Sequence, residues 1–247
     1  MSEGDGGKKA PPGKTGLRTL GARKAAVRVK SAGKRTLSSK LWLERQLNDP
    51  YVAEAQRLGF RSRAAFKLIQ LDDKFHFLQS GRIVVDLGAA PGGWTQVAAE
   101  RVKQPKGAVF GLDYLPMDPV PGAVFVQMDF LDPKAPEVLK AELTAYGGRA
   151  YADVVLSDMA APTTGHAGTD HLRIMGLAEI AYEFAAEILA QGGTFVAKVF
   201  QGGSERELLT RLKQDFSDIR HVKPPASRAG SAEMYVVALG FRGQNGG

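Results

Sequence analysis

The sequence predicts an α/β fold in which helices cover both faces of a doubly wound, mostly parallel sheet. Short, nearly continuous apolar runs rich in β-branched residues recur along the chain, as expected of strands that are covered on both faces. The runs span residues 82–87, 108–112, 123–127, 152–156, 194–199 and 234–239. Helical segments separate them, and this alternation is typical of parallel sheets that bind ligands at the carboxyl ends of their strands.

The helical segments are recognised by composition, periodicity and caps. Residues 41–49 and 50–58 carry helix-favouring side chains, and Ser62 opens a further helix that runs through Leu71. The best amphipathic pattern spans residues 170–189, where apolar side chains follow steps of three and four. Ser204 forms a capping box with the glutamate three residues later. We expect these helices to pack on the sheet.

Length and composition predict one domain with two flanking segments. The chain has 247 residues, 44% of them hydrophobic, so we expect a domain over 41–242, a disordered basic arm over 1–40 and a flexible tail over 243–247. The absence of cysteine excludes disulfides and thiolate chemistry. No run of 18 apolar residues and no signal-peptide core occur, so we expect a cytoplasmic monomer without membrane contact.

Positive charge is concentrated in the arm. Residues 1–40 hold 11 Lys and Arg against two acids, a net charge of +9, which leaves −2 for the rest of a chain whose total is +7. A disordered arm of this charge can neutralise phosphates. Charge alone does not distinguish nucleic acid from an acidic membrane or from a solubilising role.

A glycine-rich turn follows the first strand. The segment VDLGAAPGGWTQ at residues 85–96 joins that strand to a helix, and Gly88, Gly92 and Gly93 let the backbone turn tightly beside a ligand. Ala90 stands where a dinucleotide-binding turn needs its second glycine, and Pro91 stiffens the loop. The turn therefore suits a ligand without a pyrophosphate.

Acidic residues follow the next two strands. Asp113, which lies 20 residues past Gly93, can accept hydrogen bonds from both ribose hydroxyls of an adenosine moiety, and Asp129 is placed to meet the adenine amino group. Alone, each acid has an alternative role in a turn or as a helix cap, and this alternative is stronger for Asp129 than for Asp113. Together with the turn they favour S-adenosylmethionine over NAD. The predicted cofactor set is Asp86, Gly88, Gly92, Gly93, Trp94, Asp113, Asp129 and Asp158.

Further polar residues mark the remaining strand ends. Asp158 follows the fourth strand, Lys198 lies within an otherwise apolar strand, and Glu233 begins the last strand. A lysine in apolar surroundings is costly unless it is neutral, paired or at an exposed strand end. Alone, Lys67 would be a solvated helix residue and Glu233 an edge-strand charge.

These motifs together resemble the FtsJ-like ribosomal RNA 2′-O-ribose methyltransferases. The resemblance covers about residues 40–240 and includes the glycine turn, RSRAAFK at 61–67, SDM at 157–159, KVFQG at 198–202 and EMY at 233–235. It implies the seven-stranded, Rossmann-like class I methyltransferase fold, with S-adenosylmethionine as cofactor. It also implies a catalytic tetrad of Lys67, Asp158, Lys198 and Glu233. The loop after Asp158 departs from the family pattern, which leaves the rim of the substrate pocket open.

The chemistry implied by the resemblance requires a general base. A ribose 2′-hydroxyl is a poor nucleophile, so its proton must be taken as the oxygen attacks. Lys198 is the candidate base if its pKa is lowered, and the alternative is a protonated Lys198 that steers the hydroxyl while Asp158 accepts the proton. His166 and His171 are expected at the surface, and no metal is required.

The implied substrate is a uridine in large-subunit (23S) ribosomal RNA, within an assembled or assembling 50S subunit. Two basic groups are expected to grip phosphates around the target ribose, with an ordinary solvated surface as the alternative. They are Arg57, Arg61, Arg63, Arg220, Lys223 and Arg228. DNA is excluded because it lacks the 2′-hydroxyl. Alternatives are transfer RNA or an mRNA cap as substrate, a non-catalytic ribosome-assembly factor and, more remotely, a nicotinamide-dependent oxidoreductase.

Overall fold

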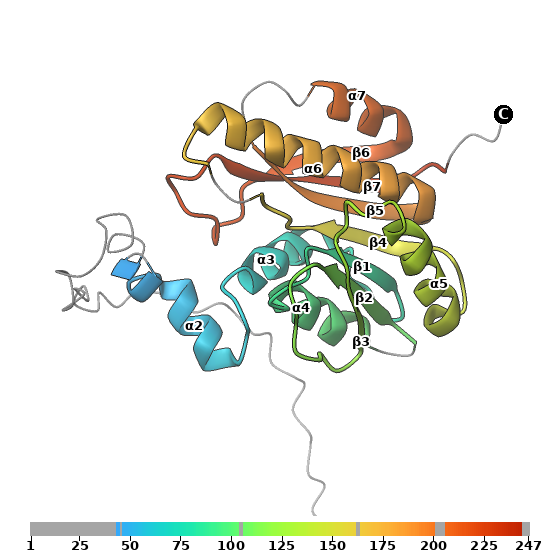
Figure 1. Cartoon of the computed structure of the whole chain (residues 1–247), viewed down its shortest axis with the longest axis horizontal. Coiled ribbons are helices and arrows are strands. Elements are labelled where there is room, and N and C mark those ends of the chain that lie inside the picture. The colour runs from blue at the N-terminus through green and yellow to red at the C-terminus, as the bar shows by residue number, and fades with distance from the viewer. Residues whose placement is uncertain (1–42, 45, 104–105, 162–163, 201–205, 244–247) are drawn as a thin grey trace, which may run out of the picture. The chain divides into compact units, whose positions relative to one another are not determined.

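A computed structural model of the chain describes residues 43–44, 46–103, 106–161, 164–200 and 206–243 (Figure 1). The predicted arm, the capping residue Ser204 and residues 201–202 of the KVFQG motif lie outside the described residues. Residues Tyr51–Gly247 form one compact unit, and the description below concerns this unit.

Seven strands form one sheet in the order β3-β2-β1-β4-β5-β7-β6. Their bounds are β1 Ile83–Leu87, β2 Ala108–Asp113, β3 Ala123–Gln127, β4 Ala152–Ser157, β5 Leu189–Phe200, β6 Phe216–Val222 and β7 Glu233–Phe241. Strands β1 to β5 pair in parallel, whereas β7 runs antiparallel between β5 and β6. The predicted doubly wound, mostly parallel seven-stranded sheet is confirmed, and its order reverses between β1 and β4, where such folds bind ligands.

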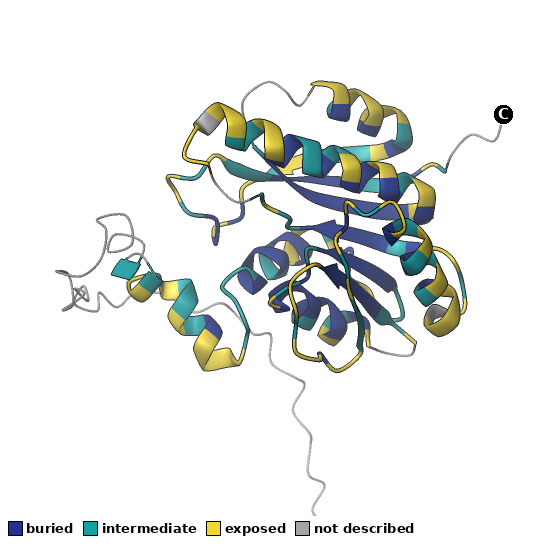
Figure 2. Ribbon diagram, in the orientation of Figure 1, coloured by how far each residue is buried: buried dark blue, intermediate teal, exposed yellow. Residues whose placement is uncertain are grey.

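Helices cover both faces of the sheet (Figure 1). The covering helices are α3 Ala65–Phe75, α4 Gly93–Val102, α5 Ala135–Gly147, α6 Ala167–Ile188 and α7 Arg206–Asp215. Helix α2, Pro50–Leu58, instead packs through Ala55 against Phe66 of α3. Along β1, Val85 packs in a core with α5, α6 and α7, and Val84 packs in a second core with α3 and α4. Figure 2 shows the strands buried between these layers. Successive side chains of a strand thus pack into the cores on opposite faces of the sheet.

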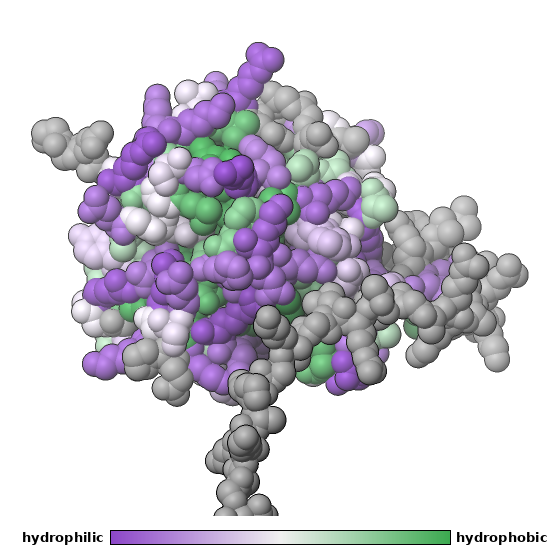
Figure 3. All heavy atoms as spheres, turned by 180° about the vertical axis from the view of Figure 1, so that it is seen from behind, coloured by the Kyte–Doolittle hydropathy of each residue, from purple (hydrophilic) through white to green (hydrophobic). Residues whose placement is uncertain are grey.

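The face of the molecule seen in Figure 3 is mainly polar. The rear view in Figure 3 shows hydrophilic side chains with small apolar areas between them. In the described ranges, no helix combines the length and the apolar character that crossing a membrane requires.

Candidate active site

The glycine-rich turn lies against the loop that follows β4. Gly88 has a φ of +76°, and a Cβ there would come within 2.7 Å of Cγ of Met159. Gly92, just before α4, has a φ of +107°, and a Cβ there would meet the Arg61 guanidinium at 2.8 Å. Both positions therefore need glycine. Because β1 and β4 are parallel neighbours in the sheet, the predicted cofactor turn after β1 and Asp158 after β4 lie side by side at the carboxyl edge of the sheet.

Asp86 is a buried acid with one unused oxygen. Its side chain is 1% exposed, Oδ2 accepts a 2.6 Å hydrogen bond from the Thr95 hydroxyl, and Oδ1 has no hydrogen-bond partner among the described residues. Burial, assisted by the charges of Asp158 and Asp113, raises the pKa of Asp86 to about 7 despite the Thr95 hydrogen bond. A buried acceptor without a partner is costly and suits a ligand that donates to it.

Asp113 and Asp129 hold the loops that follow β2 and β3. Asp113 accepts from the backbone N–H groups of Ala90 at 3.0 Å and Leu115 at 2.9 Å, so it anchors the glycine-rich turn. Asp129 is exposed and accepts from the N–H of Leu131 at 3.0 Å. Each acid therefore caps a turn, the alternative role considered from the sequence. A carboxylate oxygen can accept a second hydrogen bond, so this role leaves both acids able to accept from a ligand.

Trp94 serves the packing of α4. It is 3% exposed, its indole N–H donates to the Ala64 carbonyl at 2.8 Å, and its ring lies 5.6 Å from the ring of Tyr235. These contacts join α4 to the α3 segment and to the sheet beneath it.

The four predicted tetrad residues meet at the carboxyl end of the sheet. Lys67 comes from α3, Asp158 follows β4, Lys198 lies in β5 and Glu233 begins β7. Lys67 Nζ lies 2.7 Å from Glu233 Oε1, and Lys198 Nζ lies 2.7 Å from Asp158 Oδ1. The two pairs are cross-linked by longer contacts of 4.0 Å from Lys67 to Asp158 and 3.9 Å from Lys198 to Glu233. All four side chains are at most 16% exposed.

The lysines set the charge of Asp158. Burial alone would raise the pKa of Asp158, but the Lys198 and Lys67 ammonium groups outweigh burial and hold this pKa below its ordinary value. Lys198 also donates to the Asp158 backbone carbonyl at 2.8 Å. Asp158 is therefore an ionised carboxylate that fixes the position of Lys198.

Two residues of the site did not stand out as functional in the sequence. The Tyr235 hydroxyl donates to Asp158 Oδ1 at 2.6 Å, and the Ser227 hydroxyl donates to Glu233 Oε1 at 2.8 Å. Tyr235 follows Glu233 by two positions in a strand, so both side chains point to the same face, and this spacing could have identified it. Ser227 lies in the connection before β7, which no sequence period places.

Three of the six predicted RNA-binding residues donate to backbone carbonyls. Arg61 donates to Asp118 at 2.6 Å, to Pro119 at 2.7 Å and to Pro91 at 3.4 Å, so it ties the β2–β3 connection to the glycine-rich turn. Arg63 donates to the Ala226 carbonyl at 2.5 Å. Lys223 donates to the carbonyls of residues 229 and 231. The last two cations brace the connection that carries Ser227.

The other three candidates are placed differently. Arg57 pairs with Glu54 on α2 at 2.5 Å, and Arg220 pairs with Asp218 on β6 at 3.0 Å. Arg228 is half-buried in the β6–β7 connection. Both arginines of these ion pairs are exposed, so a phosphate can compete with the neighbouring carboxylate for each of them.

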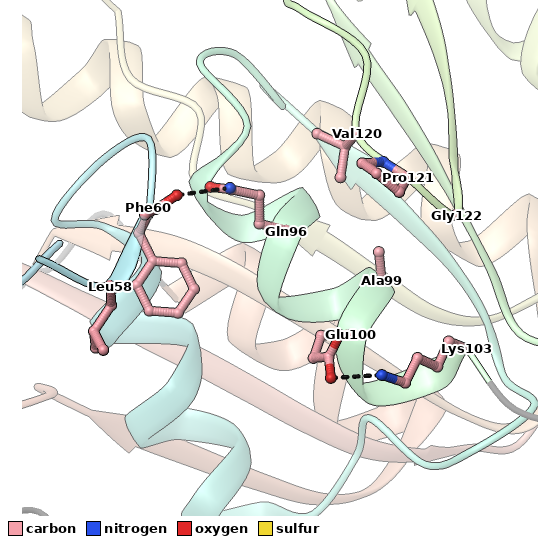
Figure 4. A pocket seen from close by; sticks show the side chains of 10 residues that line it. Leu58, Phe60, Gln96, Ala99, Glu100, Lys103, Val120, Pro121 and Gly122 are labelled. Carbon is pink, nitrogen blue, oxygen red and sulfur yellow. Dashed lines mark hydrogen bonds and ion pairs between the residues drawn. The ribbon is translucent and has the colours of Figure 1, made fainter. Parts of the chain in front are cut away.

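A cavity of about 450 Å³ lies beside α4, apart from the tetrad (Figure 4). Leu58, Phe60, Ala99 and Val120 are among its lining residues, and Gln96 crosses to the Gly59 carbonyl at 3.0 Å. No residue of the predicted cofactor set or tetrad lines it. In the described part of the chain, no group of three or more His, Asp or Glu side chains is placed to hold a metal ion.

Comparison with known proteins places this site in a family. Residues 60–241 match the model of the FtsJ-like methyltransferases. A protein of Paramagnetospirillum magneticum named ribosomal RNA large subunit methyltransferase E is 63% identical over 97% of this chain and 98% of its own length. A protein of the same name from Parvibaculum lavamentivorans is 59% identical over 99% and 96%.

Solved structures agree with this match. A Plasmodium falciparum protein described as a ribosomal RNA methyltransferase superposes with a TM-score of 0.67 at 34% identity, over 75% of this chain and all of its own. A Streptococcus thermophilus protein described as a hemolysin shares the fold, with a TM-score of 0.53 at 17% identity over 74% of this chain and 67% of its own. The long family match, the closely similar relatives and the assembled tetrad together show that this chain belongs to the FtsJ-like methyltransferase family.

Proposed function

We propose that this chain methylates the 2′-hydroxyl of a uridine ribose in large-subunit ribosomal RNA, with S-adenosylmethionine as methyl donor. The observation that carries the proposal is the cluster of two lysine–carboxylate pairs at the strand ends beside the glycine-rich turn. The curated relatives named ribosomal RNA large subunit methyltransferase E support the substrate. Ribosomal RNA as substrate would place the reaction in the cytoplasm, on an assembled or assembling subunit.

The residues at the ends of β1, β2 and β3 fit the proposed cofactor. S-adenosylmethionine supplies a methyl group on a positively charged sulfur. Asp86 offers an unpaired buried oxygen, Asp113 and Asp129 offer carboxylates, and Gly88 leaves the space beside Met159 without a side chain. These groups would hold the amine and hydroxyl donors of the cofactor.

The tetrad would prepare the ribose oxygen. Asp158, with its lowered pKa, is a weak base, so we assign proton acceptance to the Lys198 amine. Asp158 orients the Lys198 amine. Lys67, which is held in place by Glu233, would provide a positive charge that stabilises the ribose oxygen as that oxygen becomes anionic.

RNA would be held mainly by phosphate contacts. Residues 1–40, with a net charge of +9, are the strongest candidate, because Arg61, Arg63 and Lys223 already donate to backbone carbonyls. Arg57, Arg220 and Arg228 remain candidates for direct phosphate contact. Binding through the arm would weaken steeply with salt.

The test is transfer of radiolabelled methyl groups from S-adenosylmethionine to large ribosomal subunits, free ribosomal RNA and transfer RNA. We expect a 2′-O-methyl nucleotide from large subunits, and a loss of at least 100-fold in Lys198→Ala. The matched control is Lys140→Ala, which removes a lysine paired with Glu187 at 2.7 Å on the surface and should leave the rate unchanged.

Three other outcomes would redirect the proposal. Label on transfer RNA alone would change the substrate. Label in a base would contradict ribose methylation. Cofactor binding without label on any RNA would favour a non-catalytic assembly factor.

A further inference from the structure

Tyr235 occupies the centre of the tetrad. It lies opposite Lys198 in the β5–β7 pairing, it is fully buried, and Trp94 packs against its ring at 5.6 Å. Its hydroxyl lies 2.6 Å from Asp158 Oδ1 and 3.1 Å from Lys67 Nζ. The hydroxyl is therefore in hydrogen-bond contact with one member of each lysine–carboxylate pair.

The direction of the two hydrogen bonds is fixed by the available protons. A phenol has one proton, and an ionised carboxylate can only accept, so the Tyr235 proton points to Asp158. The oxygen lone pairs of Tyr235 then face Lys67, whose ammonium donates. Lys67 and Asp158 are 4.0 Å apart, which is too far for a direct hydrogen bond. The hydroxyl thus supplies the connection that these two residues lack.

We propose that the Tyr235 hydroxyl is a positioning group that joins the two ion pairs and aims the Asp158 carboxylate at Lys198. The inference rests on the proposed function of the tetrad. Burial, together with the charges of Asp158 and Glu233, raises the pKa of Tyr235 well above its ordinary value. The phenol therefore stays protonated and acts as a donor, with no role as a base.

The elements that pack around Asp158 each bring a charged group close to it. Lys67 approaches from α3 and Lys198 from β5. Glu233 is held within the same cluster by Lys67 and Lys198, and Asp86 acts from β1. The lysines and the Tyr235 hydroxyl favour ionised Asp158, whereas the two acids oppose it. Loss of the hydroxyl removes one hydrogen bond to the ionised form only, so it should raise the pKa of Asp158.

Tyr235→Phe tests this role because it removes one oxygen and keeps the buried ring. We expect methyl transfer at saturating substrates to slow about tenfold or more, the usual effect of losing a hydrogen bond to a charged group. Cofactor affinity and KM for RNA should stay within about twofold. The acid limb of the rate profile should move to higher pH, because Asp158 becomes protonated earlier.

Tyr182→Phe is the matched control. Tyr182 is 1% exposed and its hydroxyl also bonds a carboxylate, that of Asp215, but it belongs to the core on the opposite face of the sheet. This variant should unfold at a lower temperature with an unchanged rate profile. An equal loss of rate in both variants would mean that Tyr235 acts only through stability.

A carboxyl ¹³C NMR titration of the unliganded protein makes the test independent of activity. The Asp158 signal is assigned by its absence in Asp158→Asn, and its pKa is compared between wild type and Tyr235→Phe. A higher pKa in the variant supports the inference, and an unchanged pKa overturns it. Wild-type protein that transfers no methyl to any RNA would overturn the proposed function alone.

Discussion

The carboxyl edge of the sheet has two halves that are held in different ways. In the half formed by β1, β2 and β3, Asp129 bonds to Leu131 and Asp86 to Thr95, and the longest such bond, from Ala90 to Asp113, spans 23 residues. In the half formed by β4, β5 and β7, Asp158 and Lys67 reach Tyr235 across 77 and 168 residues.

Under the proposed function, this difference separates cofactor binding from methyl transfer. The first half is set by short loops, so it can form around a ligand with little rearrangement of the rest of the chain. The second half exists only when three strands and α3 are assembled. Variants that act on one half and spare the other test the division.

The largest effect is expected from Asp158→Asn. The amide keeps the shape but removes the charge that both lysines face, so methyl transfer should slow roughly 1000-fold. Single-turnover methylation of large subunits measures it. Asp129→Asn, which keeps an oxygen for the Leu131 N–H, should alter mainly cofactor affinity. Equal losses of cofactor affinity in the two variants would contradict the division.

Asp86→Asn should alter stability and its dependence on pH. The pKa of Asp86 is raised from 3.8 to about 7 in the folded chain, so the folded state binds this proton more tightly than the unfolded state. Its contribution to stability is therefore greatest below about pH 4 and declines as the pH rises to about 7. The shift corresponds to up to about 4 kcal/mol at higher pH.

Denaturant unfolding across this pH range measures the Asp86 effect. At pH 8 the variant should be more stable than wild type by about 2 kcal/mol, since the asparagine amide buries a donor that offsets part of the gain. Calorimetry should show weaker cofactor binding. A variant that is less stable than wild type at pH 8 would show that burial does not destabilise the ionised Asp86 carboxylate.

The smallest effect is expected from Arg61→Met. Its guanidinium holds the carbonyls of residues 118 and 119 beside the glycine-rich turn, so its loss should weaken cofactor binding about tenfold. RNA affinity should change less than twofold. Arg57→Met, which removes an exposed cation paired within α2, is the comparison. A loss of RNA affinity with normal cofactor binding in Arg61→Met would restore this residue to the RNA interface.

The sequence indicated the fold except for one strand and several boundaries. The resemblance implied a seventh strand, but the apolar runs did not locate β6, Phe216–Val222. This strand lies at the sheet edge and only Phe216 in it is buried, so it has no continuous apolar run. β5 begins at Leu189, where the amphipathic pattern of the preceding helix was expected to end. The helix expected from Ser62 begins at Ala65. Boundaries depend on contacts between elements that periodicity does not contain.

For the site, the sequence identified the functional side chains better than it identified the groups to which they hydrogen-bond. The acids at strand ends stand out by spacing, and the tetrad by its resemblance to a family. Backbone carbonyls have no residue type, so the partners of Arg61 and Arg63 could not be foreseen. Tyr235 belongs to the EMY motif, but its link between Asp158 and Lys67 depends on three elements meeting.

The place of β7 has a consequence for biosynthesis. This strand is the last described one in the chain, yet it lies between β5 and β6 and carries both Glu233 and Tyr235. A chain still emerging from the ribosome can hold every glycine of the cofactor turn and still lack Glu233, one of the four charged residues of the proposed tetrad, together with Tyr235. Under the proposed function, a chain that ends before β7 lacks the complete tetrad and should not transfer methyl groups.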